Sequence, residues 1–263
     1  MPEWLAIVLL GLIEGITEFL PVSSTGHLLI AEHWLPRQSD LFNIVIQSAA
    51  VLAVIPLFPE RLRQLLRCHT DPAARDFLLK AGAAFFITGV GGVLLDKGGF
   101  ELPEHPLPVA LTLVAGGVLF LMAERWLKGR TVTEEVTWRV AALVGLGQLL
   151  AAVFPGASRS GATILLMLFL GMSRTAATEF SFLVGIPTML AAGGLKIFKA
   201  LHQPVPGTPA ENWGLLLLGV VVSGVVSFMV VKWLLHFVRS HTFVGFGWYR
   251  IALGAVLLLW FLR

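Results

Sequence analysis

The stretch EGITEFLPVSSTGH, residues 14–27, decides how this chain folds. It ends an apolar run, residues 4–20, and precedes a second run, residues 28–35, that is too short to cross a bilayer, because a spanning helix needs about 20 apolar residues. The pattern predicts a helix that enters the membrane, breaks at Pro21 and returns as a re-entrant hairpin. Irregular backbone at membrane depth is tolerated only where protein buries it or a water-filled cavity accepts it. The break therefore marks a candidate site.

A second stretch, PGASRSG at residues 155–161, interrupts the apolar runs 140–154 and 162–171 in the same way. Sliding the chain by 134 residues superposes the two interruptions without a gap. The superposed pairs are Gly11 with Gly145, Glu14 with Gln148, Pro21 with Pro155 and Ser24 with Ser158, and Thr25 then falls opposite Arg159. We expect internal repeats over residues 1–125 and 135–263. Repeated broken helices place a binding site near the bilayer midplane, where the copies meet.

The composition indicates the class of protein. Of the 263 residues, 56% are apolar and only 13% are charged, and the mean hydropathy is +0.83. A soluble domain carries about 25% charged residues, so we expect an integral membrane protein whose partner is the lipid bilayer. The single cysteine, Cys68, excludes a disulfide framework and a multi-cysteine metal site. The net charge of +3 does not indicate nucleic-acid binding, because the basic residues lie between apolar runs and record orientation.

Six apolar runs are long enough to be full spans. They are 42–59, 79–96, 107–126, 176–196, 214–237 and 247–262. The expected fold is an all-α integral membrane protein, one membrane domain over 1–263, with six transmembrane helices and two re-entrant helical hairpins. An odd number of crossings between the two copies makes them an inverted-topology repeat. The first residues, Met1 to Trp4, lack the basic segment of an export signal, so we expect them in the mature fold.

The charges of the loops predict the orientation. If the loop at 60–80 is cytoplasmic, thirteen Lys and Arg residues, Arg250 among them, fall on the cytoplasmic side and five fall on the other side. Basic loops favour the cytoplasm, so we expect both termini outside and the loop at 125–139 inside. The first hairpin then enters from the outer face and the second from the cytoplasm.

Two carboxylates lie at membrane depth in the first hairpin. Glu14 and Glu18 are four residues apart, which places them on one face of a helix. An ionisable group inside the bilayer costs about 2.5–3.5 kcal/mol on insertion scales, so each is a functional hypothesis by default. Either one carboxyl keeps its proton, or a cation, Mg²⁺ or Ca²⁺, lies between them. The alternative is that one glutamate only faces a polar cavity.

Hydroxyl and imidazole groups follow the carboxylates directly after the break. Ser23, Ser24, Thr25 and His27, beside the two glutamates, are the parts of an activated-nucleophile site. Alone, the hydroxyls would be typical of a helix cap and the histidine of a hydrogen-bonded core residue.

The second break has the features of an anion site. Ser158, Arg159, Ser160 and Gly161 begin a helix, whose free N–H groups and positive dipole end attract phosphate. The guanidinium of Arg159 adds two parallel donors that match a phosphate edge. The alternative is a structural ion pair between Arg159 and Glu14 or Glu18.

At these residues the chain closely resembles the undecaprenyl-pyrophosphate phosphatase family, the bacitracin-resistance proteins. The resemblance is carried by EGITEFLPVSSTGH at 14–27 and PGASRSGAT at 155–163, with FSFL at 180–183 and Ile186-Pro187 also fitting. It runs the whole length, and it implies the six-span inverted-repeat fold. It also implies hydrolysis of undecaprenyl pyrophosphate to the monophosphate and phosphate at the outer face of the bacterial cytoplasmic membrane, which recycles the lipid carrier of peptidoglycan synthesis and confers bacitracin resistance.

Carried over residue by residue, the resemblance places catalysis on Glu14, Glu18, Ser24, His27 and Arg159. The two glutamates are also the expected metal ligands, and Ser24 and His27 are rival nucleophiles. The groups expected to bind the substrate are Ser23, Thr25, Gln148, Ser158, Ser160 and Gly161.

Two other classes of protein fit parts of the pattern. Inverted repeats of broken helices are also transporter architecture, so a polyprenyl-phosphate flippase is the alternative function. The acid-phosphatase-like lipid phosphatases need an Arg-Pro dipeptide, which this sequence lacks. The sequence does not decide whether the protein forms a homodimer.

Overall fold

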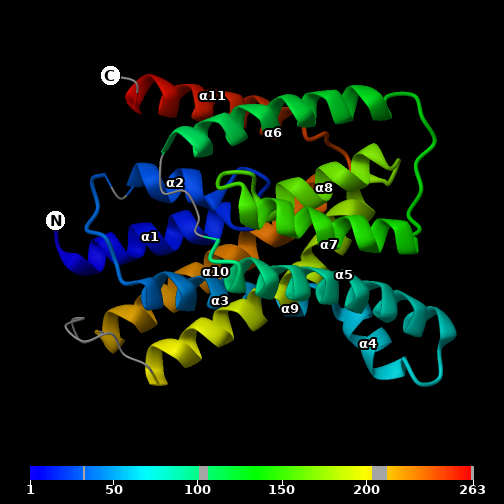
Figure 1. Cartoon of the computed structure of the whole chain (residues 1–263), viewed down its shortest axis with the longest axis horizontal. Coiled ribbons are helices and arrows are strands. Elements are labelled where there is room, and N and C mark those ends of the chain that lie inside the picture. Colours follow the sequence, from blue (N-terminus) through cyan, green and yellow to red (C-terminus); the bar gives the residue numbers. More distant parts are fainter. Residues whose placement is uncertain (32, 101–105, 203–211, 262–263) are drawn as a thin grey trace.

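The computed structural model describes residues 1–31, 33–100, 106–202 and 212–261, and over these it consists of helices (Figure 1). The first half contains α1 (Glu3–Thr17), α2 (Ser24–Ala31), α3 (Asp40–Val54), the short 3₁₀ helix η1 (Ile55–Leu57), α4 (Pro59–Arg67), α5 (Pro72–Lys97) and α6 (Pro106–Leu127). The second half contains α7 (Trp138–Val153), α8 (Arg159–Phe169), α9 (Arg174–His202), α10 (Trp213–Phe237) and α11 (Val244–Phe261). The all-helical membrane fold is confirmed.

Five of the described helical segments are long and apolar enough to cross a membrane. They are Asp40–Leu57, Pro72–Lys97, Pro106–Leu127, Arg174–His202 and Trp213–Phe237. They match the first five predicted spans. The sixth predicted span, 247–262, corresponds to α11, whose apolar described part, Val244–Trp260, is shorter than each of those five segments. Residue 262 lies outside the described residues, as does residue 32 of the short run 28–35.

The two broken apolar runs form helix pairs on opposite sides of the molecule. In Figure 1, α1 runs inward from the end where the N terminus lies and α2 runs back, while α7 and α8 do the same from the opposite end. Both termini lie at the first end, and the α4–α5 connection lies at the other. This is the arrangement expected if the loop at 60–80 lies across the membrane from the termini.

Each entering helix packs against a long helix from the other half of the chain. Helix α1 packs on α10, and α7 packs on α5. Both contacts need glycine: a Cβ on Gly15 would lie 2.9 Å from the Ser223 carbonyl oxygen, and a Cβ on Gly145 would lie 2.8 Å from that of Ala84. The close approach places the breaks in the middle of the bundle, between α3, α9, α6 and α11.

The main core surrounds the breaks. Phe19, next to Glu18, is fully buried and meets Phe182 of α9 edge-on, with ring centroids 5.3 Å apart. Large apolar side chains also cover the outside, including Leu66, Phe86 and Leu259. An exposed apolar surface of this extent is stable only in lipid, whereas the interior packs around the polar breaks.

An ion pair between the half-buried Arg174 and the buried Glu124 fixes α9 to α6 away from the breaks. The Arg174 Nε donates to Glu124 Oε1 over 2.9 Å, and Arg174 Nη2 donates to Glu124 Oε2. The Phe243 backbone N–H also donates to Glu124, over 2.8 Å. This pair is structural, and it provides a control for the arginines described below.

Candidate active site

The first break is shorter than the sequence pattern predicts. Helix α1 ends at Thr17, Glu18 keeps helical backbone angles as its C-cap, and α2 begins at Ser24. Residues 24–27, predicted to lie in the break, therefore form the first turn of α2. Ser23 has φ +71° and its Oγ accepts the Gly26 backbone N–H over 3.3 Å. This cap turns the chain sharply into α2.

The second break repeats this cap with one extra residue. Ser158 has φ +66°, and its Oγ accepts the Gly161 backbone N–H over 3.2 Å. Ser158 thus corresponds to Ser23, and the gapless offset of 134 is wrong beyond the prolines, where the offset is 135. The longer turn includes Gly156, whose φ is +86°, and a Cβ there would lie 2.7 Å from the Val109 carbonyl oxygen. The residue opposite Arg159 is therefore Ser24, not Thr25.

Ser24 and Arg159, the first residues of α2 and α8, converge on Glu18. The Ser24 hydroxyl donates to Glu18 Oε2 over 3.0 Å. Arg159 Nη2 lies 3.9 Å from Glu18 Oε1, so the two groups form a loose ion pair. A hydroxyl, a carboxylate and a guanidinium are thus brought together where the two breaks meet.

Two further residues, which sequence reasoning missed, complete this cluster. Gln47 of α3 donates its amide to Glu18 Oε2 over 3.2 Å. Gly185 of α9 leaves room for Arg159, since a Cβ there would overlap the guanidinium. The signal for Gln47 was an amide within an apolar span, whereas Gly185 carries no signal that a single sequence reveals.

The Arg159 guanidinium is buried and only partly bonded. Its Nη1 donates to the Ser181 carbonyl oxygen over 3.4 Å, while Nε and Nη2 have no hydrogen-bond partner in the described chain. Buried donors left without a partner are costly unless a ligand accepts from them. Both atoms lie at the start of α8, whose free N–H groups also favour an anion.

Glu14 lies one helical turn before Glu18 and is 2% exposed. Its Oε1 has no hydrogen-bond partner among the described residues. No group of three or more potential metal-binding side chains occurs within the described ranges. The side chains here that could hold a cation are the two carboxylates of Glu14 and Glu18, and two carboxylates are fewer ligands than the 6–8 oxygens that Ca²⁺ takes, whereas Mg²⁺ is commonly held by one or two carboxylates plus substrate phosphate.

His27 is held between the first break and α11. Its Nδ1 lies 2.7 Å from the Ser23 carbonyl oxygen, and Nε2 lies 2.6 Å from the Tyr249 hydroxyl. A carbonyl only accepts, so Nδ1 donates to it, and when the ring is neutral Nε2 accepts from the tyrosine hydroxyl. Tyr249 was also missed, although it is the only tyrosine in the sequence.

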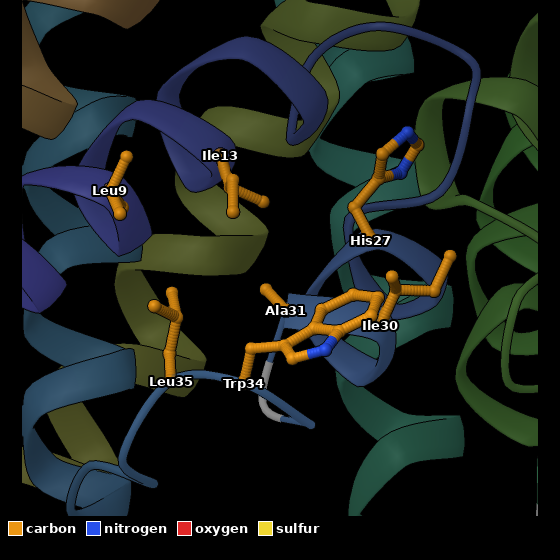
Figure 2. A pocket seen from close by; sticks show the side chains of 7 residues that line it. All are labelled: Leu9, Ile13, His27, Ile30, Ala31, Trp34 and Leu35. Carbon is orange, nitrogen blue, oxygen red and sulfur yellow. The ribbon is translucent and has the colours of Figure 1, made fainter.

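An apolar cavity of about 340 Å³ opens beside His27, between α1 and α2 (Figure 2). The figure shows Leu9 and Ile13 on one side, with Ile30 and Trp34 on the other. Ala31 and Leu35 complete the lining. A hydrocarbon chain can occupy this cavity while its polar end reaches His27.

The predicted substrate-binding residues have different surroundings. Ser160 is fully buried, its Oγ donating to the Leu20 carbonyl oxygen over 3.3 Å, and the Ser158 Oγ is 3.1 Å from it. The Thr25 side chain is exposed. Gln148 lies in the α5–α7 interface, where its amide donates to Thr88 over 2.9 Å. Ser158 and Ser160 therefore join the meeting point of the breaks, whereas Gln148 contacts α5.

One basic residue was wrongly counted as a loop charge. Arg250, counted with the cytoplasmic loops, is fully buried within α11 and donates to carbonyl oxygens of both breaks. It records no orientation, so twelve Lys and Arg residues stay on the side assigned to the cytoplasm. A basic residue near the start of an apolar run looks like a loop charge until the helix boundary is known.

Comparisons with known proteins agree on one family. A family profile described as "Bacitracin resistance protein BacA" matches residues 7–256. The chain is 49% identical over 258 residues to the undecaprenyl-diphosphatase of Rhizobium etli (strain CIAT 652), covering 97% of this chain and 96% of that one. It is 48% identical over 261 residues to the undecaprenyl-diphosphatase of Xanthomonas axonopodis pv. citri (strain 306), covering 99% and 98%.

Proposed function

The chain belongs to the bacitracin-resistance protein BacA family, and from that premise we propose that it hydrolyses undecaprenyl pyrophosphate to undecaprenyl phosphate and phosphate. Relatives of nearly the same length carry this activity in their names at 47–49% identity. The observation that carries the proposal is the convergence of Ser24 and Arg159 on Glu18. The product is the lipid carrier that cell-wall synthesis reuses, and removing its pyrophosphate form deprives bacitracin of its target.

The arrangement supports a displacement at the terminal phosphorus. Arg159 holds the phosphate with Nε and Nη2, which have no hydrogen-bond partner in the described chain, and the N–H groups at the start of α8 add donors. Glu18 takes the proton of the Ser24 hydroxyl as its oxygen bonds to phosphorus, and the bond to the bridging oxygen breaks. Undecaprenyl phosphate leaves, and water then cleaves the phosphoserine and releases phosphate. Positioning and charge neutralisation supply most of such a rate enhancement.

The hydrogen bonds favour Ser24 over His27 as the nucleophile. The Ser24 hydroxyl already donates to a carboxylate, whereas His27 Nε2 is engaged by Tyr249. His27 fits the role of the group that protonates the leaving phosphate or activates the water. The prenyl units next to the pyrophosphate would lie in the cavity of about 340 Å³ beside it.

Glu14 and Glu18 would hold the divalent cation, Mg²⁺ or Ca²⁺. The unpaired, buried Glu14 Oε1 supports this assignment, since a carboxylate oxygen without a donor at membrane depth needs a proton or a cation. When bound, the ion would neutralise charge on the pyrophosphate.

The topology we propose is six spans with two inverted repeats, each contributing one break. Helix α7 is the counterpart of α1, and α10 is the counterpart of α5. The packing of α1 on α10 therefore matches the packing of α7 on α5, and this match supports the repeat. The twelve basic residues on the side of the 60–80 loop support an outward-facing first hairpin. A headgroup in the outer leaflet would then reach Ser24 without crossing the bilayer.

Phosphate release from defined polyprenyl pyrophosphates by the purified protein in detergent tests the function, with and without chelator. A phosphatase releases phosphate where no gradient exists, and a flippase does not. Release by wild type and its loss with Ser24→Ala are expected. Absence of release by an intact, folded wild type would favour the flippase.

Impermeant maleimide labelling of intact cells tests the orientation on a Cys68→Ser background. Cysteine at Gly98 is expected to react, and cysteine at Thr70 or Thr133 is not. All three positions are exposed. The reverse pattern would place the first hairpin on the cytoplasmic side.

A further inference from the structure

Arg250 bonds to both breaks at once. Its Nη1 donates to the Pro21 carbonyl oxygen over 3.1 Å, in the first break. Its Nη2 lies 3.1 Å from the carbonyl oxygens of Gly156 and Ala157, in the second break. The same nitrogen lies 3.3 Å from the Thr112 carbonyl oxygen of α6. One fully buried guanidinium therefore connects three chain segments.

These carbonyls are the groups that a broken helix leaves unpaired. Backbone acceptors inside a membrane protein must be satisfied by protein, because lipid offers no donors. The planar fork of arginine directs its donors at fixed angles, whereas the ammonium of lysine is a point charge that cannot reproduce this spacing. Arg250 therefore does more than neutralise dipoles, because it sets how far apart the two breaks lie.

That spacing controls the catalytic groups. Pro21 precedes Ser24 by three residues, and Ala157 precedes Arg159 by two. The other polar contacts between the breaks in the described chain are the hydrogen bond from Ser160 Oγ to the Leu20 carbonyl oxygen and the loose ion pair of Arg159 with Glu18. Displacement of Arg250 would thus shift the nucleophile relative to the phosphate clamp.

The space around the guanidinium is shaped to fit it. A Cβ on Gly116 of α6 would overlap the guanidinium, and a Cβ on Gly161 of α8 would lie 3.1 Å from Nη1. Tyr249, the residue before Arg250, holds His27 through its hydroxyl over 2.6 Å. Two consecutive residues of α11 thus contact both breaks and the histidine.

The positive charge of Arg250 has no carboxylate partner in the described part of the chain, where its hydrogen bonds go to carbonyls and none of the ion pairs includes it. A buried cation of this kind favours an anion nearby. The pyrophosphate supplies that anion in the proposed reaction.

We propose that Arg250 is a positioning residue for the phosphatase reaction: it holds the two breaks at the separation that aligns Ser24 with a phosphate bound by Arg159. The inference rests on the proposed function. It assigns to α11 a role in catalysis without contact to the reacting atoms.

The test is Arg250→Lys against the matched control Arg174→Lys, both assayed for phosphate release and for thermal unfolding in detergent. Arg174 is a half-buried arginine whose side chain is 32% exposed, and its replacement weakens the pair with Glu124 at a distance from the breaks. We expect Arg250→Lys to lower kcat about 30-fold or more with KM within about threefold, since misalignment acts on the transition state. Arg174→Lys is expected to lower Tm while kcat stays within about threefold of wild type.

Gly116→Ala provides a second route if Arg250→Lys does not fold. It keeps the arginine but displaces the guanidinium, so a similar loss of kcat is expected. Wild-type kcat in a folded Arg250→Lys or Gly116→Ala protein would overturn the inference while leaving the proposed function intact. Equal losses of kcat and Tm in Arg250→Lys and Arg174→Lys would also overturn it. Absence of phosphate release by wild type would instead remove the proposed function.

Discussion

In the first hairpin the returning helix begins with Ser24, and in the second it begins with Arg159. Both follow a serine with positive φ that caps the helix through its hydroxyl. The backbones of the two breaks are thus built alike, and the side chains at the first helical position differ. The comparison teaches that one local geometry can present a hydroxyl from one side and a guanidinium from the other, which are the nucleophile and the phosphate clamp of the proposed reaction.

The helices before the breaks differ in the same way. Glu14 and Gln148 are counterparts, and both are buried. Gln148 has a structural contact with Thr88, whereas Glu14 keeps an oxygen without a partner. We therefore expect the carboxylates of the first hairpin to do chemistry and the amide of the second to hold α7 against α5. The predictions below test this division.

Removal of the nucleophile is expected to have the largest effect. Ser24→Ala should lower kcat by about a thousandfold or more, because the covalent step is lost. Arg174→Lys, which alters a contact away from the breaks, is the control and should stay near wild type. Phosphate-release kinetics with both variants provide the measurement.

A double variant sharpens this prediction. If Glu18 acts through Ser24, adding Glu18→Gln to Ser24→Ala should cost little more than Ser24→Ala alone, since residues that act as a unit are not additive. Full additivity would show that Glu18 acts elsewhere.

Arg159→Lys is expected to lower kcat/KM about a hundredfold with the fold intact, because lysine keeps the charge and loses the planar fork. The variant is to be compared with Arg174→Lys in the same assay. If Arg159→Lys keeps the kcat/KM of wild type, Arg159 is not the phosphate clamp.

Substitutions at the two glutamates should lower kcat to different extents. Glu18→Gln is expected to lower kcat about a hundredfold as loss of a general base, and Glu14→Gln about tenfold, because Glu18 alone bonds to Ser24. Activity with and without chelator separates the roles. Equal losses, with residual activity that ignores the chelator, would indicate that the pair acts together without a metal.

The smallest effect on catalysis is expected at the counterpart, Gln148→Glu. A carboxylate in the α5–α7 interface should lower the free energy of unfolding by about 1–3 kcal/mol, with kcat of the folded protein nearly unchanged. Thermal unfolding in detergent measures the change in stability, and phosphate release measures kcat. A large loss of kcat at unchanged Tm would place Gln148 in the substrate site.

The sequence was sufficient for the all-helical membrane class, because apolar run lengths indicated the spans. It also named Glu18, Ser24 and Arg159 from residue types near a helix break, and the structure brings these three together, while their roles in catalysis stay predictions. The offset failed because Gly156 adds a residue whose positive φ no apolar pattern reveals. Gln47, Tyr249 and Arg250 were missed because long-range packing brings them to the breaks, and spacing along the chain carries no record of that.

The exchanged packing also bears on how the protein is made. Helix α1 is synthesised first, yet its packing partner α10 begins at Trp213. At 5–20 residues per second, about 10 to 40 s pass before the ribosome delivers that partner. During this interval Glu14 and Glu18 have no second half to shield them from lipid, so we expect the insertion machinery or bound water to shelter the nascent hairpin. Hydrolytic competence should therefore arise only after the last third of the chain has entered the membrane.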